Sequence, residues 1–482
     1  MEETLLSLIV GGILALSVVA AFAASRLGVP SLVAFLGFGM LLGSEGIGGF
    51  EFANPELARI IGSVCLIAIL FEGGMSTSLR RLREAVVPAA LLSTVCVVIT
   101  ALLTGLAAHY LFGLPWLYAM LLGAVVSSTD AAAVFATLRF TKIRRRIARL
   151  IEAESGGNDP MAIALTVGFI SWIQQPEYNI GNLFIMLSQQ LGIGLAAGLI
   201  LGAAAMYIFG RLPHSIGAFA PVASVATAAL TFGLTSLIGG SGFLAVYIVG
   251  LAIGSTPSRY RGQLTMFHEG VAFVSQVTMF VILGLLVFPS QLLAVALPSI
   301  ALVLLLVFFI RPIAVWLSIP FGHFTRSEKA LIGWAGLRGA VPIVLAAFVL
   351  SAGIEREYGN VIFNAVFFVV LVSALIQGTT LDWVARKLGV VDKLPEDKEL
   401  PHPDRMEKIY FHVAPEHAIA GAHVYEIGLI RHAHVKSIKR RDKTIPVERE
   451  TIIKPGDRLC IVAPYSLHPE VEDVFIRWRR RV

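Results

Sequence analysis

Long apolar runs alternate with short polar segments over the first 388 residues of the chain. A run of about 20 apolar residues is long enough to cross the hydrocarbon core of a bilayer as a helix. The runs predict about thirteen transmembrane helices, at residues 5–25, 30–48, 57–78, 86–109, 115–138, 149–173, 180–209, 217–238, 241–256, 266–288, 291–318, 329–352 and 359–385. Residues 1–388 are therefore predicted to form an all-α, polytopic membrane domain.

The pattern changes after this domain. Residues 389–406 are rich in proline and charge, which is typical of a linker. Residues 407–482 contain strand-like segments separated by turn sequences at Asp442–Lys443 and Pro455–Asp457. This last region is predicted to be a small α/β domain in the cytosol.

Basic residues are unevenly distributed between alternate loops, and this bias predicts the orientation. With the N-terminus outside, the outer loops hold little beyond Arg356. An excess of Lys and Arg marks cytoplasmic loops, so the protein is predicted to lie in the cell (inner) membrane with its C-terminus in the cytoplasm. The inner-loop positions are Arg26, Arg80, Arg81, Arg83, Lys142, Arg144, Arg145, Arg146, Arg149, Arg211, Arg259, Arg261, Arg326, Lys329, Arg386 and Lys387.

Composition agrees with a membrane protein and argues against other classes. Hydrophobic residues make up 56% of the chain and charged residues 15%, whereas soluble proteins contain about 25% charged residues. The net charge of +6 lies in the inner loops and the C-terminal tail, so anionic lipid headgroups rather than nucleic acid are the predicted neighbours. The three cysteines have no C-x-x-C spacing, and no cofactor is expected.

Four polar clusters interrupt the apolar runs, at residues 71–74, 127–130, 154–159 and 336–339. Ionisable residues inside a membrane are expensive and are functional by default. In the cluster 154–159, Ser155, Asn158 and Asp159 share one helix face, and Glu154 aligns with Asn158. Gly156, Gly157 and Pro160 are expected to loosen the helix at this point.

Two of the predicted spans should be broken near the middle of the membrane. Thr129 and Asp130 precede an alanine run, which is an N-cap pattern and predicts that the fifth span stops and restarts. Glycines and a proline bracket Arg338 in the same way in the twelfth span. Paired breaks in corresponding halves indicate a secondary transporter, with spans 1–6 and 8–13 as inverted repeats.

The charged residues of these clusters have different expected roles. Asp130 is predicted to cap a helix rather than to bind an ion. A buried arginine needs an acid, and Glu154 is the expected partner of Arg338. Asp159 is then the carboxylate without a cationic partner, while Glu72 is either a further ligand or a simple polar contact. A cation and a proton compete for such a carboxylate, which with alternating access gives exchange, most simply one cation for one proton.

These motifs, in this order, resemble those of the cation:proton antiporter family, in its NhaP-like branch with an Asn-Asp pair. The resemblance implies a homodimer of thirteen-helix protomers and electroneutral exchange of Na⁺ or K⁺ for H⁺. It implies Asp159 as the exchanging acid, Ser155 and Thr129 as oxygen ligands, and Glu72 as a further participant. It also implies Asn158 as a supporting amide and Glu154 with Arg338 as a stabilising ion pair. Ala131 departs from the family pattern, which usually has proline after Thr-Asp.

Residues 408–464 resemble the C-terminal subdomain of domains that regulate potassium conductance. Such domains often dimerise and bind a small ligand, and they accompany K⁺ transport, which favours K⁺ as the cation. No G-x-G-x-x-G fingerprint precedes this region, so an NAD sensor is not expected.

Other functions stay open at this point. An Na⁺/H⁺ antiporter without K⁺ preference, a domain-gated cation channel and a sensor without transport are the alternatives. The channel is disfavoured because no sequence resembling a TVGYG filter occurs. Enzyme activity has no supporting motif, since no nucleophile elbow, HExxH or Walker sequence is present.

Overall fold

The protein divides into two compact units, Met1–Asp392 and Lys393–Val482, and each is described by itself. The computed structural model describes residues 11–12, 15–22, 31–52, 54–77, 86–138, 143–211, 219–256, 260–319, 324–391, 406–429, 433–440, 443–448, 450–464, 471, 474–475 and 478. Most of the predicted first span and the linker residues 392–405 lie outside this set. The same holds for the basic residues Arg26, Arg80, Arg81, Arg83, Lys142 and Arg259.

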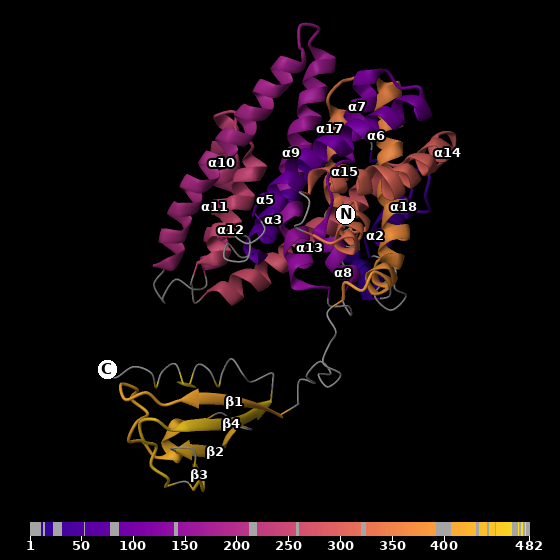
Figure 1. Ribbon diagram of the computed structural model, residues 1–482. Helices are drawn as coiled ribbons and strands as arrows, with labels where there is room; N and C mark the ends of the chain where they lie inside the picture. The colour runs from indigo at the N-terminus through magenta and orange to yellow at the C-terminus, as the bar shows by residue number, and fades with distance from the viewer. Residues whose placement is uncertain are drawn as a thin grey trace, which may run out of the picture. The chain divides into compact units, whose positions relative to one another are not determined.

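The first unit is helical (Figure 1). Its helices are α2 (Ser31–Leu42), α3 (Pro55–Ser76), α5 (Val86–Leu91), η1 (Leu92–Cys96), α6 (Val97–Phe112), α7 (Trp116–Val125), α8 (Ala131–Thr137), α9 (Arg145–Gln174), α10 (Ile180–Gly210), α11 (Ala220–Leu237), α12 (Gly242–Ser255), α13 (Arg261–Leu286), α14 (Pro289–Leu305), η3 (Leu306–Ile310), α15 (Arg311–Ser318), α16 (Arg326–Trp334), α17 (Ala340–Ser351) and α18 (Arg356–Lys387). Among the described residues, seven helical segments are long and apolar enough to cross a membrane. Every predicted span from the second to the thirteenth corresponds to one helix or to consecutive helices of this series, so the prediction of the fold class is confirmed.

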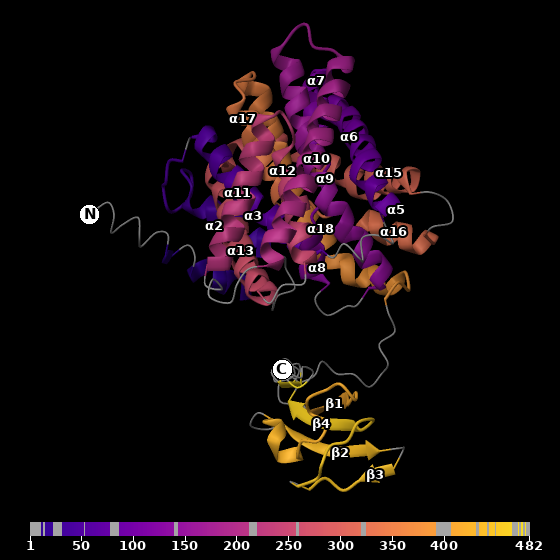
Figure 2. The ribbon, with the colours of Figure 1, turned by 90° about the vertical axis from the view of Figure 1, so that its left-hand side faces the viewer.

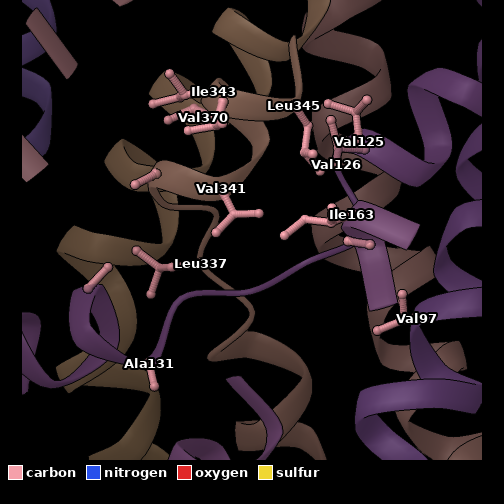
Figure 3. Close-up of a cluster of buried hydrophobic side chains, with 14 of the residues drawn as sticks. Val97, Val125, Val126, Ala131, Ile163, Leu337, Val341, Ile343, Leu345 and Val370 are labelled. Atoms are coloured by element: carbon pink, nitrogen blue, oxygen red, sulfur yellow. The ribbon is translucent and has the colours of Figure 1, made fainter. Parts of the chain in front are cut away.

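The two predicted breaks are present. In the fifth span the chain leaves the helix after Val125 and re-enters it at Ala131, and Figure 3 shows the extended segment between Val126 and Ala131. In the twelfth span the helix stops at Trp334 and resumes at Ala340. Asp130 begins α8 as its N-cap, because its carboxylate accepts a hydrogen bond of 3.2 Å from the backbone N–H of Ala133.

Two further irregularities lie in corresponding spans of the two repeats. The fourth span contains the π-helical turn η1 and the eleventh span contains the π-helical turn η3. A π-turn inserts one residue into the helical repeat and rotates the side chains that follow it, and such turns are frequent at functional sites. Both turns are used by the site described below.

Glycines allow close packing between α3 and α12. A Cβ on Gly74 would lie 2.3 Å from the carbonyl oxygen of Tyr247, and one on Gly250 would lie 2.4 Å from that of Phe71. Only glycine permits the two backbones to approach this closely, as at other membrane helix interfaces. Helices α10 and α11 lie beside α12 at the edge of the helical unit (Figures 1 and 2).

The second unit is built on an antiparallel sheet of four strands in the order β1-β4-β2-β3. The strands are β1 (Met406–His412), β2 (His434–Arg440), β3 (Lys443–Ile445) and β4 (Arg458–Pro464), and a short helix η4 spans Val424–Ile427. One face of the sheet is buried, and Phe475 covers it by stacking on Phe411 with ring centroids 4.4 Å apart. The prediction of a small α/β domain is confirmed.

Candidate functional site

Helix α9 carries the largest group of buried polar residues. Glu154, Asn158 and Asp159 are 2%, 0% and 8% exposed, which places all three inside the helical unit. The helix runs through Pro160 without a break. The neighbouring glycines serve close packing: a Cβ on Gly156 would lie 2.0 Å from the ring of Tyr247 on α12.

Asn158 and Ser155 join α9 to the break in the fifth span. The amide nitrogen of Asn158 donates to Thr129 Oγ1 at 2.7 Å and to the Thr129 carbonyl at 3.2 Å. Ser155 Oγ donates to the same carbonyl at 3.2 Å and accepts from the backbone N–H of Ala131 at 3.2 Å. Helix α9 therefore satisfies two backbone groups of the unwound segment, the Thr129 carbonyl and the Ala131 N–H, as buried backbone requires. The side-chain oxygen of Asn158 is buried and has no hydrogen-bond donor among the described residues.

Asp159 is the acid of this cluster that has no counter-charge. Among the described residues, no Lys, Arg or His forms an ion pair with its carboxylate. The side chain of Ser128 is near enough to interact with the Asp159 carboxylate. The charged residue that interacts with this carboxylate is another acid, Asp130. A carboxylate buried without a cation needs a proton or a bound cation for compensation.

The breaks of the fifth and twelfth spans cross and bond to each other. The backbone N–H of Asp130 donates to the carbonyl of Leu337 at 2.8 Å, and Arg338 Nε donates to the carbonyl of Val126 at 3.2 Å. A Cβ on Gly339 would lie 1.8 Å from Asp130 Oδ2, so only glycine fits at this crossing. Arg338 is fully buried and binds backbone carbonyls, including that of Gly336.

The prediction that Glu154 pairs with Arg338 is wrong. Glu154 pairs with Arg311 at the start of α15, and both side chains are almost completely buried. Arg311 Nη1 also contacts Cys96 Sγ at 3.0 Å, while the Ser93 hydroxyl donates to the Glu154 carbonyl at 3.0 Å. Ser93 and Cys96 belong to η1, and Arg311 follows η3 directly, so both π-turns contribute to this pair.

A signal for Arg311 exists in the sequence. It is the one charged residue in the apolar run 291–318, and an intramembrane arginine is a functional hypothesis by default. The length and apolarity of the run predict only a long span. Its pairing with Glu154 depends on how far the π-turn rotates α15, which periodicity does not reveal.

Glu72 lies near the end of α3 and is half-buried. Its carboxylate accepts a hydrogen bond of 2.6 Å from the Ser76 hydroxyl, and it interacts electrostatically with Glu269 and Asp130. Glu72 thus lies on the Asp130 side of the site. The structure brings Asp159, Asn158, Ser155, Thr129 and Asp130 together.

Tyr247 on α12 is a residue that sequence reasoning missed. Its ring lies against Gly156, its hydroxyl is buried near the side chain of Thr77, and it interacts electrostatically with Asp159. Nothing in the apolar run 241–256 distinguishes this tyrosine as part of the site, because the contact arises from the packing of α12 on α9.

The membrane part of the chain matches a known family model. Residues 13–387 match the model described as sodium/hydrogen exchanger, transmembrane. The chain belongs to the sodium/hydrogen exchanger family. Membership confirms the prediction of a multi-pass cation/proton exchanger rather than an enzyme.

Relatives in this exchanger family span most of the chain. The K(+)/H(+) antiporter NhaP of Alkalimonas amylolytica is 44% identical over 407 residues, which cover 83% of this chain and 70% of the relative. The K(+)/H(+) antiporter NhaP2 of Shewanella sp. (strain ANA-3) is 36% identical and matches 97% of this chain and 84% of the relative. The Na(+)/H(+) antiporter ApNhaP of Aphanothece halophytica is 31% identical over 70% of this chain and 66% of the relative.

A solved structure shares the fold. The sodium proton antiporter MjNhaP1 from Methanocaldococcus jannaschii superposes with a TM-score of 0.72 at 23% sequence identity. The match covers 80% of this chain and 99% of the other. This likeness supports the arrangement of helices described above.

Proposed function

We propose that this exchanger carries K⁺ in one direction and H⁺ in the other at Asp159, electroneutrally and one for one. The observation that carries the proposal is a buried carboxylate with no cationic partner among the described residues. Since either H⁺ or K⁺ can compensate its charge, the two ions compete for one site. One carboxylate exchanges one unit of charge in each direction, so the cycle moves no net charge.

The other acids of the cluster are already engaged. Glu154 is neutralised by Arg311, and Asp130 caps α8. Neither is free to exchange a second proton, which supports a one-for-one count. Glu72 interacts with Asp130 and accepts from Ser76, and we propose that it tunes the site or assists the bound cation.

The side-chain oxygens around Asp159 suit an alkali cation. Oxygen ligands replace the hydration shell of K⁺ in proteins. Asp159, Thr129 and Ser155 offer carboxylate and hydroxyl oxygens, and Asn158 Oδ1 has no described donor. We assign these four residues as the cation ligands, with Asn158 also fixing Thr129.

K⁺ is preferred over Na⁺ as the proposed substrate because of the relatives and the C-terminal domain. The relatives of 44% and 36% identity are named K(+)/H(+) antiporters, and the second match extends through the C-terminal domain. Na⁺/H⁺ exchange is the alternative, since a relative of 31% identity is named an Na(+)/H(+) antiporter.

Alternating access is supported by a cavity with several polar lining residues at the opposite end of α3 from Glu72. The cavity has a volume of about 580 Å³ and is lined by Asn54, Arg356 and Asn364 among others. An apolar layer lies next along α3: a Cβ on Gly62 would lie 3.2 Å from both methyl groups of Val344. Glu72 is about 15 Å further along the helix at 1.5 Å per residue. We propose that this layer closes the outer side while the site faces inward.

Further features of assembly, orientation and regulation complete the proposal. The protein works as a homodimer in the inner membrane, with its N-terminus outside. Its basic inner loops contact anionic lipid headgroups, and its C-terminal domain lies in the cytoplasm. That domain regulates exchange through a small ligand.

The test is dissipation of an imposed pH gradient in proteoliposomes on addition of KCl or NaCl. The Asp159→Asn variant should lose the K⁺-dependent signal. Glu177→Gln, which neutralises an exposed loop carboxylate, should retain it. Clamping the membrane potential should not alter the rate.

Each alternative predicts a different result. A signal with NaCl alone supports Na⁺/H⁺ exchange. Cation flux driven by potential in the absence of proton movement supports a channel. Retained exchange in Asp159→Asn would overturn the assignment of this residue.

A further inference from the structure

The C-terminal sheet has one buried face and one open face. Phe411, Leu459 and Ile438 are directly paired across β1, β4 and β2 and point into the domain core. Because successive residues of a strand point to opposite faces, the next rung of the ladder points outward. That rung consists of His412, Arg458 and Lys439, and all three are exposed.

The three side chains form an adjacent basic row. His412 pairs with Arg458, and Arg458 pairs with Lys439 in the register of the sheet. Directly opposed side chains have Cβ atoms about 4.5–5.5 Å apart, and like charges at such positions destabilise a sheet. In the part of the domain that the structure describes, none of the three forms a hydrogen bond or an ion pair.

Arg440, which lies next to this row, differs from the three residues because it forms an ion pair. Arg440 follows Lys439 but is held by the buried carboxylate of Asp457, with hydrogen bonds of 2.8 and 2.7 Å. These bonds raise the pKa of Arg440 and keep it charged. Asp457 also accepts from the backbone N–H of Lys454 at 2.8 Å, which fixes the turn before Arg458. These bonds fix the backbone at the end of the sheet that carries the row. The buried acid Asp457 binds Arg440 and not a residue of the row.

An aromatic ring lies on the same face. Tyr410 is two residues before His412 on β1 and is 63% exposed. An exposed ring beside a cationic row offers a flat surface for a base or ring system next to the site for its phosphates.

We propose that the row His412, Arg458 and Lys439 binds a phosphate-bearing anion, and that this is where the C-terminal domain receives its regulatory signal. Charge complementarity selects the ligand class, because phosphate oxygens accept hydrogen bonds from arginine and lysine together. The proposal rests on the regulatory role assigned to this domain above. The phosphate belongs to a soluble nucleotide or to an anionic lipid headgroup.

The first arm measures binding of ATP to the purified full-length protein in detergent by calorimetry, and needs no transport. The double variant Arg458→Gln/Lys439→Gln should weaken binding by about tenfold or more, and raised salt should weaken binding to the unmodified protein. Lys454→Gln removes an exposed charge on the same domain outside the row and should bind normally. Tyr410→Ala should weaken binding of ATP but not of inorganic triphosphate.

The second arm measures exchange in proteoliposomes with and without phosphatidylglycerol. If ATP does not bind, but the double variant loses the dependence on phosphatidylglycerol, the headgroup is the ligand. If neither ATP binding nor the lipid dependence differs between the double variant and the unmodified protein, the proposal is overturned. Thermal unfolding of the double variant confirms that the domain is folded in either case.

Discussion

The amide nitrogen of Asn158 lies 2.7 Å from Thr129 Oγ1 and joins α9 to the unwound segment between α7 and α8. The same nitrogen donates to the Thr129 carbonyl at 3.2 Å. This orientation leaves the amide oxygen of Asn158 facing no described donor. Asn158 therefore holds α9 and the unwound segment together, and its own side-chain oxygen stays available for the proposed cation.

Replacing this amide should weaken cation binding without abolishing exchange. Asn158→Ala removes both hydrogen bonds to Thr129 and leaves buried groups unsatisfied, which costs about 1–3 kcal/mol. Since about 1.4 kcal/mol corresponds to tenfold in affinity, the K⁺ concentration for half-maximal exchange should rise about tenfold. Asn182→Ala, at the exposed start of α10, is the control. An unchanged half-maximal concentration would show that Asn158 does not position the ligands.

The Glu154–Arg311 pair should show strong coupling in a double-mutant cycle. Removing one partner of a buried pair leaves an uncompensated charge and costs about 3–5 kcal/mol. Glu154→Gln and Arg311→Gln should each lower the unfolding temperature in detergent, and the double variant should recover part of the loss. The combination Glu154→Gln with Arg338→Gln should show no recovery. Equal recovery in both combinations would contradict the pairing seen here.

The Glu154–Arg311 pair also shows which parts of the site can be predicted from the sequence and which cannot. Apolar runs and cap residues were enough to predict the spans and both breaks, because those depend on local chemistry. The face shared by Ser155, Asn158 and Asp159 followed from helical spacing alone. Helical spacing did not predict the partner of Glu154, because η3 rotates α15 and brings Arg311 to the position that Arg338 was expected to take. Arg338 instead binds backbone carbonyls, a role that no spacing rule predicts.

The contacts of Tyr247 and the basic row of the C-terminal sheet could not be predicted from the sequence, for a related reason. Each depends on the pairing of segments distant in sequence. His412, Arg458 and Lys439 become neighbours only in the strand order β1-β4-β2. Strand character was visible from alternation, but the order and register were not.

The crossing of the two breaks should tolerate no side chain at Gly339. Its Cβ would lie 1.8 Å from Asp130 Oδ2, so Gly339→Ala must displace the cap of α8. We expect loss of exchange and a destabilisation of about 1–3 kcal/mol, typical of overpacking. Gly192→Ala is the matched control, because nothing lies within 4 Å of its Cβ position on α10. An active Gly339→Ala protein would show that the crossing can relax.

Arg144 should connect the C-terminal domain to the site. Its backbone N–H donates to the Val390 carbonyl at 3.0 Å, and its guanidinium reaches Gly389 and Glu328 at 3.1 and 3.3 Å. These contacts join the segment leading to the linker with the starts of α9 and α16. Deleting residues 397–482 should alter the pH dependence of exchange, and Arg144→Gln should reduce that change.

The control for Arg144→Gln is the variant Arg386→Gln, which breaks an exposed ion pair with Asp382 on α18. Exposed pairs contribute about 0–1 kcal/mol, so Arg386→Gln should alter unfolding little. Arg144→Gln leaves the buried carboxylate of Glu328 without its cation and should destabilise the protein more. Exchange rates across a pH series, with and without the deletion, provide the measurement. The same deletion effect in Arg144→Gln and in the unmodified protein would exclude this route.

The hydrogen bonds between the two breaks also bear on biogenesis. Val126 and Asp130 reach the membrane with the first half of the chain, but their partners Arg338 and Leu337 are synthesised about 200 residues later. Unsatisfied backbone groups cost several kcal/mol each in hydrocarbon. The nascent first half therefore has to keep this segment hydrated or shielded until the second half inserts. The proposed ion site is completed only when translation of the membrane domain is nearly finished.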